Sequence, residues 1–257
     1  MVIINCTGYF KTWVDFEEIK EFDLGDGFVL IIDTDSTKKV DKTFAVNGRV
    51  NNNFANEIEV RKRVLKFLSY LSVYIDAPSM DLSFNSFSVE NPKEPNFGSS
   101  TIGLYTIGGK SSINKLLTKG QLDKFRSKIK IDDDNSLIDF YRNSYSSDNV
   151  ANYWYLYLVF LEHILRNNKG EKIEERKKID DLIKNIIKQN KYEKDYMPKR
   201  RNDYENGKEW TIFIAIRDSF SHGSTFDGGN KLDIEKELNN NIDKFRKIAR
   251  DLILSLY

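Results

Sequence analysis

Hydrophobic positions in the second half of the chain recur at helical spacing in four segments. Residues 150–166 are apolar on nearly every face, whereas residues 171–192 carry one stripe of isoleucine and leucine opposite a face rich in lysine and glutamate. Residues 209–222 form a third segment, and a fourth begins after Asp233, a residue type that favours helix N-caps. Amphipathic helices joined by short connections predict an all-α, antiparallel four-helix bundle.

The first half of the chain mixes strand patterns with one helical pattern. Residues 55–75 place leucine and isoleucine at helical spacing and predict a helix. One expected strand runs into Asn47-Gly48, a dipeptide suited to the positive φ angles of a tight hairpin turn. The expected strands are residues 28–33, 43–46, 82–89 and 101–107.

A polar stretch between residues 117 and 147 separates the two patterns. It contains Asp132-Asp133-Asp134, which is typical of a solvated turn or a helix N-terminus and has no further cation ligands at loop-motif spacing. We place a boundary after residue 131. The chain is therefore predicted to be α+β, with a mixed α/β domain at residues 1–131 in a sensor or regulatory role and a helical domain at residues 132–257.

Composition narrows the chemistry and the location of the protein. The 40 lysine and arginine residues balance 39 aspartate and glutamate residues, so nucleic-acid binding would depend on local patches. One cysteine, Cys6, and two histidines exclude a disulfide framework and a cysteine- or histidine-rich zinc site, and Cys6 is expected to be a small buried residue. We expect neither a metal nor a cofactor. The longest apolar run, residues 153–161, falls short of a membrane span of about 18 residues, and a cytoplasmic location is expected.

The segment with the clearest chemical content is Arg217-Asp218-Ser219-Phe220-Ser221-His222, at the end of the third expected helix. It resembles the signature of the HEPN superfamily, in which an arginine and an adjacent polar residue precede a histidine after four to six intervening positions. Four residues intervene here, and Asp218 occupies the polar position. The mixed first half is similar to that of larger proteins with an Apea-like HEPN domain.

This resemblance implies a metal-independent endoribonuclease that acts in toxin or antiviral defence, with RNA as its substrate. It implies attack by the ribose 2′-hydroxyl on the adjacent phosphate, which leaves a 2′,3′-cyclic phosphate. It also implies a homodimer through the C-terminal bundle, and an antitoxin or regulatory partner is a further expectation. Arg217, His222 and Asp218 would be the catalytic residues. Their chemistry fits these roles, because imidazole exchanges protons near neutral pH and guanidinium binds phosphate oxygens with a planar fork.

Further RNA contacts are expected from Ser221 and from the basic run Lys199-Arg200-Arg201, since lysine and arginine neutralise backbone phosphates. Two other interpretations stay open. The C-terminal half is alternatively a noncatalytic RNA- or nucleotide-binding HEPN dimerisation module. Arg217 and His222 could also cap a helix end and pair with carboxylates in a bundle without activity. Substitution of His222 separates these interpretations, because it abolishes cleavage only in an enzyme.

Overall fold

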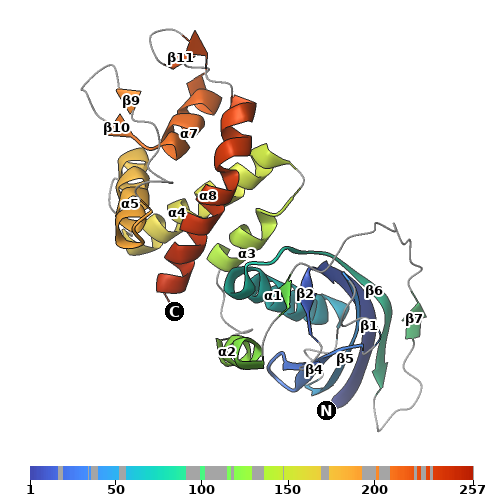
Figure 1. Ribbon diagram of the computed structural model, residues 1–257. Coiled ribbons are helices and arrows are strands. Elements are labelled where there is room, and N and C mark those ends of the chain that lie inside the picture. The colour runs from blue at the N-terminus through green and yellow to red at the C-terminus, as the bar shows by residue number, and fades with distance from the viewer. Residues whose placement is uncertain are drawn as a thin grey trace. The chain divides into compact units, whose positions relative to one another are not determined.

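The computed structural model divides the chain into two compact units, Met1–Asn135 and Ser136–Tyr257, which are described separately (Figure 1). The first unit is built on an antiparallel sheet and the second on helices, so the chain is α+β. The sequence placed the division slightly earlier, after residue 131. The structure describes residues 1–16, 20–33, 35, 40–51, 56–90, 99–101, 115–116, 119–128, 136–146, 148–168, 174–192, 201–202, 209–222, 225–226, 230–231 and 234–256.

The N-terminal unit contains a six-stranded antiparallel sheet in the order β3-β4-β5-β1-β6-β7 (Figure 1). Helix α1 (Glu57–Ile75) covers one face, where its Phe67 ring packs against Phe10 and Phe22. A second helix, α2, spans Lys119–Lys128, and a short parallel pair joins β2 (Val14–Asp15) to β8 (Lys115–Leu116). The six strands are β1 (Val2–Thr12), β3 (Glu21–Asp23), β4 (Phe28–Ile32), β5 (Asp41–Val50), β6 (Ser79–Glu90) and β7 (Ser99–Thr101).

The expected helix at residues 55–75 and the expected strands at 28–33, 43–46 and 82–89 are confirmed. Most of the strand expected at 101–107 lies outside the described residues. Strand β1 was not expected, although it pairs with both β5 and β6. Its alternate side chains, Cys6 among them, are buried against α1, and burial raises the pKa of the Cys6 thiol to about 12.

The hairpin turn expected at Asn47-Gly48 is wrong, because both residues lie inside the continuous strand β5. A Cβ atom at Gly48 would lie 3.0 Å from Cδ1 of Phe28, so the glycine allows a close approach between neighbouring strands. The tight turn in this region is Gly25–Gly27, where three successive residues have positive φ angles. Buried Arg63 of α1 fastens this turn by donating hydrogen bonds to the Leu24 carbonyl and the Asp26 carboxylate.

A buried lysine gives the N-terminal unit a pH-dependent stability. Lys42 is fully buried beside the Phe16 ring, and burial lowers its pKa from 10.5 to about 8, although the nearby Asp15 carboxylate raises it. Between these two pH values the unfolded chain binds more protons than the folded chain. The contribution of Lys42 to the free energy of unfolding should therefore rise with pH across this range, by up to ~3 kcal/mol.

Urea unfolding of wild type and Lys42→Met, near pH 8 and near pH 10.5, measures this contribution. The variant should be the more stable protein near pH 8, and most of its advantage should disappear near pH 10.5. An advantage of equal size at both pH values would contradict the assignment.

The C-terminal unit contains helices at all four segments that the sequence predicts to be helical. Residues 209–211 precede the third helix instead of opening it. One helix, α3 (Ser136–Asn143), was not expected. No helix in the described part of the chain is both long and apolar enough to cross a membrane. The four predicted helices are α4 (Asn149–Asn167), α5 (Glu175–Gln189), α7 (Ile212–His222) and α8 (Ile234–Ser255).

The expectation of an all-α unit is wrong in one respect, because two short antiparallel strand pairs connect the helices. One pair joins β9 (Arg201–Asn202) to β10 (Glu209–Trp210), directly before α7. The other joins β11 (Thr225–Phe226) to β12 (Asn230–Lys231), between α7 and α8. Both pairs flank α7, so the backbone enters and leaves this helix through paired strands.

A cluster of aromatic rings lies in the core of the C-terminal unit among buried aliphatic side chains, and Phe245 of α8 lies at its centre. Its ring stacks on Phe213 of α7 at 4.5 Å between centroids and on Phe160 of α4 at 5.3 Å. Tyr153 of α4 also contacts Phe245, and its buried hydroxyl donates a 2.7 Å hydrogen bond to the Phe213 carbonyl. These contacts fix α7 between α4 and α8.

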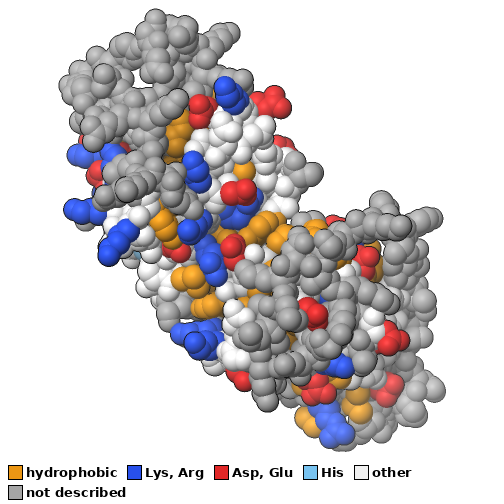
Figure 2. Space-filling model, viewed as in Figure 1, with side chains coloured by type: hydrophobic (Ala, Val, Ile, Leu, Met, Phe, Trp, Pro, Cys, Tyr) orange, Lys and Arg blue, Asp and Glu red, His pale blue; other side chains and the backbone are white. Residues whose placement is uncertain are grey.

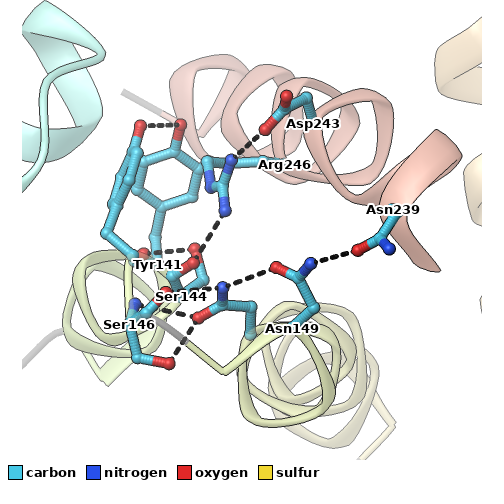
Figure 3. A network of polar contacts seen from close by, with 9 residues as sticks. Tyr141, Ser144, Ser146, Asn149, Asn239, Asp243 and Arg246 are labelled. Atoms are coloured by element: carbon cyan, nitrogen blue, oxygen red, sulfur yellow. Dashed lines mark hydrogen bonds and ion pairs between the residues drawn. The ribbon is translucent and has the colours of Figure 1, made fainter. Parts of the chain in front are cut away.

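A polar network fastens the turn between α3 and α4 to α8 (Figure 3). Arg246 of α8 donates to the Ser144 carbonyl at 2.8 Å, and buried Asn152 exchanges hydrogen bonds with the side chain and backbone of Ser146. These polar groups bond mainly to one another and to the turn backbone. The role of the network is therefore structural, since its contacts hold the turn against α8.

Candidate active site

The structure places Arg217 and Asp218 on α7, where the helix passes from buried to half-exposed positions. Residues 211–216 are buried, whereas the side chains of Arg217 and Asp218 retain 26% and 19% of their exposure. The hydroxyl of Tyr153 bonds to the helix backbone one turn before Arg217. Arg217 therefore projects from a helix whose backbone is held by the core.

Asp218 bridges two arginines, its neighbour Arg217 and Arg176, which lies 42 positions before it in the sequence. Its Oδ1 atom accepts a hydrogen bond of 3.2 Å from Nη1 of Arg217, and its Oδ2 atom accepts one of 3.0 Å from Nη1 of Arg176 on α5. Each carboxylate oxygen thus binds one guanidinium. The arrangement gathers two cations around one anion at the surface of α5 and α7.

Arg176 is held on a second side by Trp210 of β10. Its guanidinium carbon lies 4.2 Å from the centroid of the Trp210 ring, a distance typical of a stacked cation–π pair. The sequence did not indicate either residue as part of a site. Arg176 belongs to the lysine- and glutamate-rich face of its helix, and Trp210 falls within the third expected helix, residues 209–222.

Tyr157 of α4 joins this cluster from the other side. Its hydroxyl donates a 2.7 Å hydrogen bond to Glu175 of α5 and also contacts the Arg217 side chain. Burial of Arg217 acts to lower its pKa, but Tyr157 and Asp218 act in the opposite direction, and the pKa lies above its usual value. Burial and the bond to Glu175 raise the pKa of Tyr157. At neutral pH the Arg217 guanidinium is therefore positively charged, and the Tyr157 hydroxyl is neutral.

The remaining expected site residues are only partly described. His222 is the last residue of α7, but its side chain and that of Ser221 lie outside the described residues. Five positions in a helix correspond to about 140° of rotation and ~7.5 Å of rise between Arg217 and His222. Lys199 and Arg200 also lie outside the described residues. Arg201 begins β9, and its backbone pairs with that of Trp210, the residue whose ring lies against Arg176.

The other polar and charged groups of the described residues do not form a second candidate site. Among the side chains that the structure describes, no cluster of histidine, cysteine, aspartate and glutamate could hold a metal ion, and Asp132–Asp134 lie outside the described residues. His163 of α4 is half-buried and hydrogen-bonds Asn167, and its pKa is lowered by burial and by Arg166. On the visible surface, lysine and arginine lie beside aspartate and glutamate, in keeping with the balanced composition (Figure 2).

Comparisons with protein-family models, with curated proteins and with solved structures identified no match.

Proposed function

We propose that the protein is a metal-independent endoribonuclease of the HEPN type, with α4, α5, α7 and α8 as its four-helix domain and a role in toxin or antiviral defence. The observation that carries this proposal is the Arg217–Asp218 pair on α7, with His222 on the same helix five positions after Arg217. Arg217 is half-exposed, permanently charged and fixed by Asp218 and Tyr157. Such a guanidinium is preorganised to bind an oxyanion.

The proposed reaction uses the RNA as its own nucleophile. The 2′-hydroxyl attacks the adjacent phosphorus, the bond from phosphorus to the 5′-oxygen breaks, and the products are a 2′,3′-cyclic phosphate and a 5′-hydroxyl. His222 takes the proton from the 2′-hydroxyl or gives one to the leaving oxygen. Arg217 stabilises the negative charge that gathers on the phosphate oxygens. Asp218 sets the direction of the Arg217 fork, and Ser221 with Lys199–Arg201 contacts the RNA backbone.

An apolar stripe on α4 supports a homodimer as the active form. The stripe contains Val150, Trp154, Leu158, Leu161 and Leu165, at intervals of four, four, three and four residues. Val150 and Leu165 are exposed, and the other three are intermediate in burial. This spacing is close to the 3.6 residues of one helical turn, so the five side chains lie along one side of α4, and a twofold dimer would bury the same side of both copies. Trp154 also contacts Phe220, which lies between Arg217 and His222 on α7. Pairing through this stripe would bring the motifs of two copies to one interface.

Charge placed in the stripe should separate the dimer. We expect Leu158→Glu/Leu161→Glu to be a folded monomer by light scattering at micromolar concentration and to lose RNA cleavage, because a desolvated carboxylate opposes pairing. Ile58→Glu is the control, since Ile58 is an apolar residue on α1 with 80% exposure. A wild-type protein that is monomeric at this concentration would contradict the shared site.

Cleavage of labelled single-stranded RNA and of total RNA in excess chelator tests the proposed function directly. The wild type should cut and leave cyclic-phosphate ends, and Arg217→Ala/His222→Ala should not cut. If the wild type binds RNA without cutting it, and His222→Ala binds equally well, the protein is a noncatalytic RNA-binding module. If wild type and variant cut alike, the nuclease lies elsewhere or is a contaminant, and Arg217 and His222 are not the site.

A further inference from the structure

Arg176 has a fixed position that its surface location alone does not require. Its side chain is 40% exposed, yet its guanidinium lies against the Trp210 ring and bonds to Asp218. An exposed arginine normally samples many rotamers, and ordering it costs up to about 2 kcal/mol of conformational entropy. An isolated surface ion pair returns about 0–1 kcal/mol. The stack on Trp210 supplies a second contact that holds the side chain.

The contacts of Arg176 lead to Arg217 through a single carboxylate. Asp218 would be free to rotate about its side-chain bonds if only Oδ1 were bonded, to the neighbouring Arg217. The bond from Arg176 to Oδ2 fixes the second oxygen and therefore the plane of the carboxylate. A carboxylate with a fixed plane in turn fixes the direction in which Nη1 of Arg217 points.

We infer that Arg176 is a positioning residue, which orients the Arg217 guanidinium through Asp218 and is itself held by Trp210. This inference rests on the proposed ribonuclease function of the same site. Arg176 lies on α5 and Arg217 on α7, so the orientation of the phosphate-binding group depends on contacts between two helices. Loss of such an orienting contact lowers the rate of the chemical step, because a small misplacement of a catalytic group costs about 10- to 100-fold.

Steady-state cleavage by the full chain distinguishes positioning from a direct contact with RNA. Arg176→Gln and Asp218→Asn should each lower kcat by about 10-fold or more and leave KM within about 2-fold. The double variant should be no slower than the slower single variant, because both changes break one chain of contacts. Lys177→Gln is the matched control, since it removes one positive charge at the adjacent, more exposed position of α5.

Two measurements that do not depend on turnover complete the test. In the His222→Ala background, Arg176→Gln should leave the salt dependence of RNA binding unchanged, whereas loss of a direct phosphate contact would reduce the slope by about 0.7. In NMR spectra, Arg176→Gln should accelerate solvent exchange of the Nη1 protons of Arg217, which bond to Asp218, and Lys177→Gln should not.

Additive losses in kcat, or a reduced salt slope, would overturn positioning and make Arg176 a direct RNA contact. Cleavage that Arg176→Gln leaves unchanged would overturn any role for Arg176, with the ribonuclease function intact. A wild-type protein that neither binds nor cuts RNA would overturn the ribonuclease function itself.

Discussion

Exchange of Arg217 for lysine is expected to lower kcat for RNA cleavage by about 100- to 1,000-fold while the protein stays folded. Lysine keeps the positive charge but lacks the planar fork, so it loses the directed contacts with Asp218 and Tyr157. An ammonium group also lacks the two parallel, coplanar N–H donors with which a guanidinium matches a pair of phosphate oxygens. Removal of one preorganised donor to a developing oxyanion costs this much in other enzymes.

Arg166→Lys is the control for this experiment. Arg166 lies on α4, has 40% exposure and pairs with Glu162, so it undergoes the same chemical change outside the site. Its variant should cut RNA as the wild type does. If Arg217→Lys keeps its kcat within about threefold of wild type, Arg217 acts only as a point charge and the bidentate role is wrong.

Exchange of Asp180 for alanine is expected to lower the free energy of unfolding of the C-terminal unit by ~3 kcal/mol. Asp180 of α5 is 2% exposed and accepts a 2.7 Å hydrogen bond from the buried backbone N–H of Thr211, directly before α7. It also pairs with Lys184 at 2.6 Å. Alanine leaves the Thr211 amide buried without this acceptor, and a carboxylate at a helix N-terminus is lost.

Urea unfolding followed by tryptophan fluorescence measures this loss. Asp181→Ala is the matched control, because the adjacent carboxylate is exposed and its removal should change stability by no more than about 0.5 kcal/mol. Asp180→Asn should fall between the two, since an amide oxygen can still accept from Thr211. Equal stabilities of Asp180→Ala and Asp181→Ala would show that the bond to Thr211 contributes nothing.

The parts of the fold that sequence reasoning predicted are those in which local pattern and tertiary environment agree. Helices α5 and α8 bury one stripe each, so their apolar spacing repeats over several turns. Strand β1 was missed because Ile3 and Tyr9 are apolar on the face away from the core and obscure the alternation. The turn predicted at Gly48 was wrong because glycine is favoured both in tight turns and where two strands approach closely. Only the position of the Phe28 ring, which the sequence does not show, distinguishes the two cases.

The candidate site was predictable only along α7. Arg217, Asp218 and His222 stand within six positions of one another, so one helical segment displays them together. Arg176, Tyr157 and Trp210 come from other elements, and each has an ordinary structural explanation in its own segment. Their contribution depends on tertiary contacts, such as the bond between Arg176 and Asp218, that no local spacing encodes.

Two residues of α5 bind α7 at different points along it. Asp180 binds the backbone of Thr211, directly before α7, and Arg176 binds Asp218, in the second half of α7. Asp180 and Arg176 are four residues apart, on adjacent turns of α5, so both bonds depend on the same stretch of helix. Local unfolding of this stretch would expose a buried carboxylate and release both contacts at once. Amide hydrogens of α5 and α7 should therefore exchange with solvent as one cooperative unit. Whether Arg217 and Asp218 stay in fixed positions then depends on α5 and α7 together. A change that destabilises α5 far from Arg217 is enough to make them mobile.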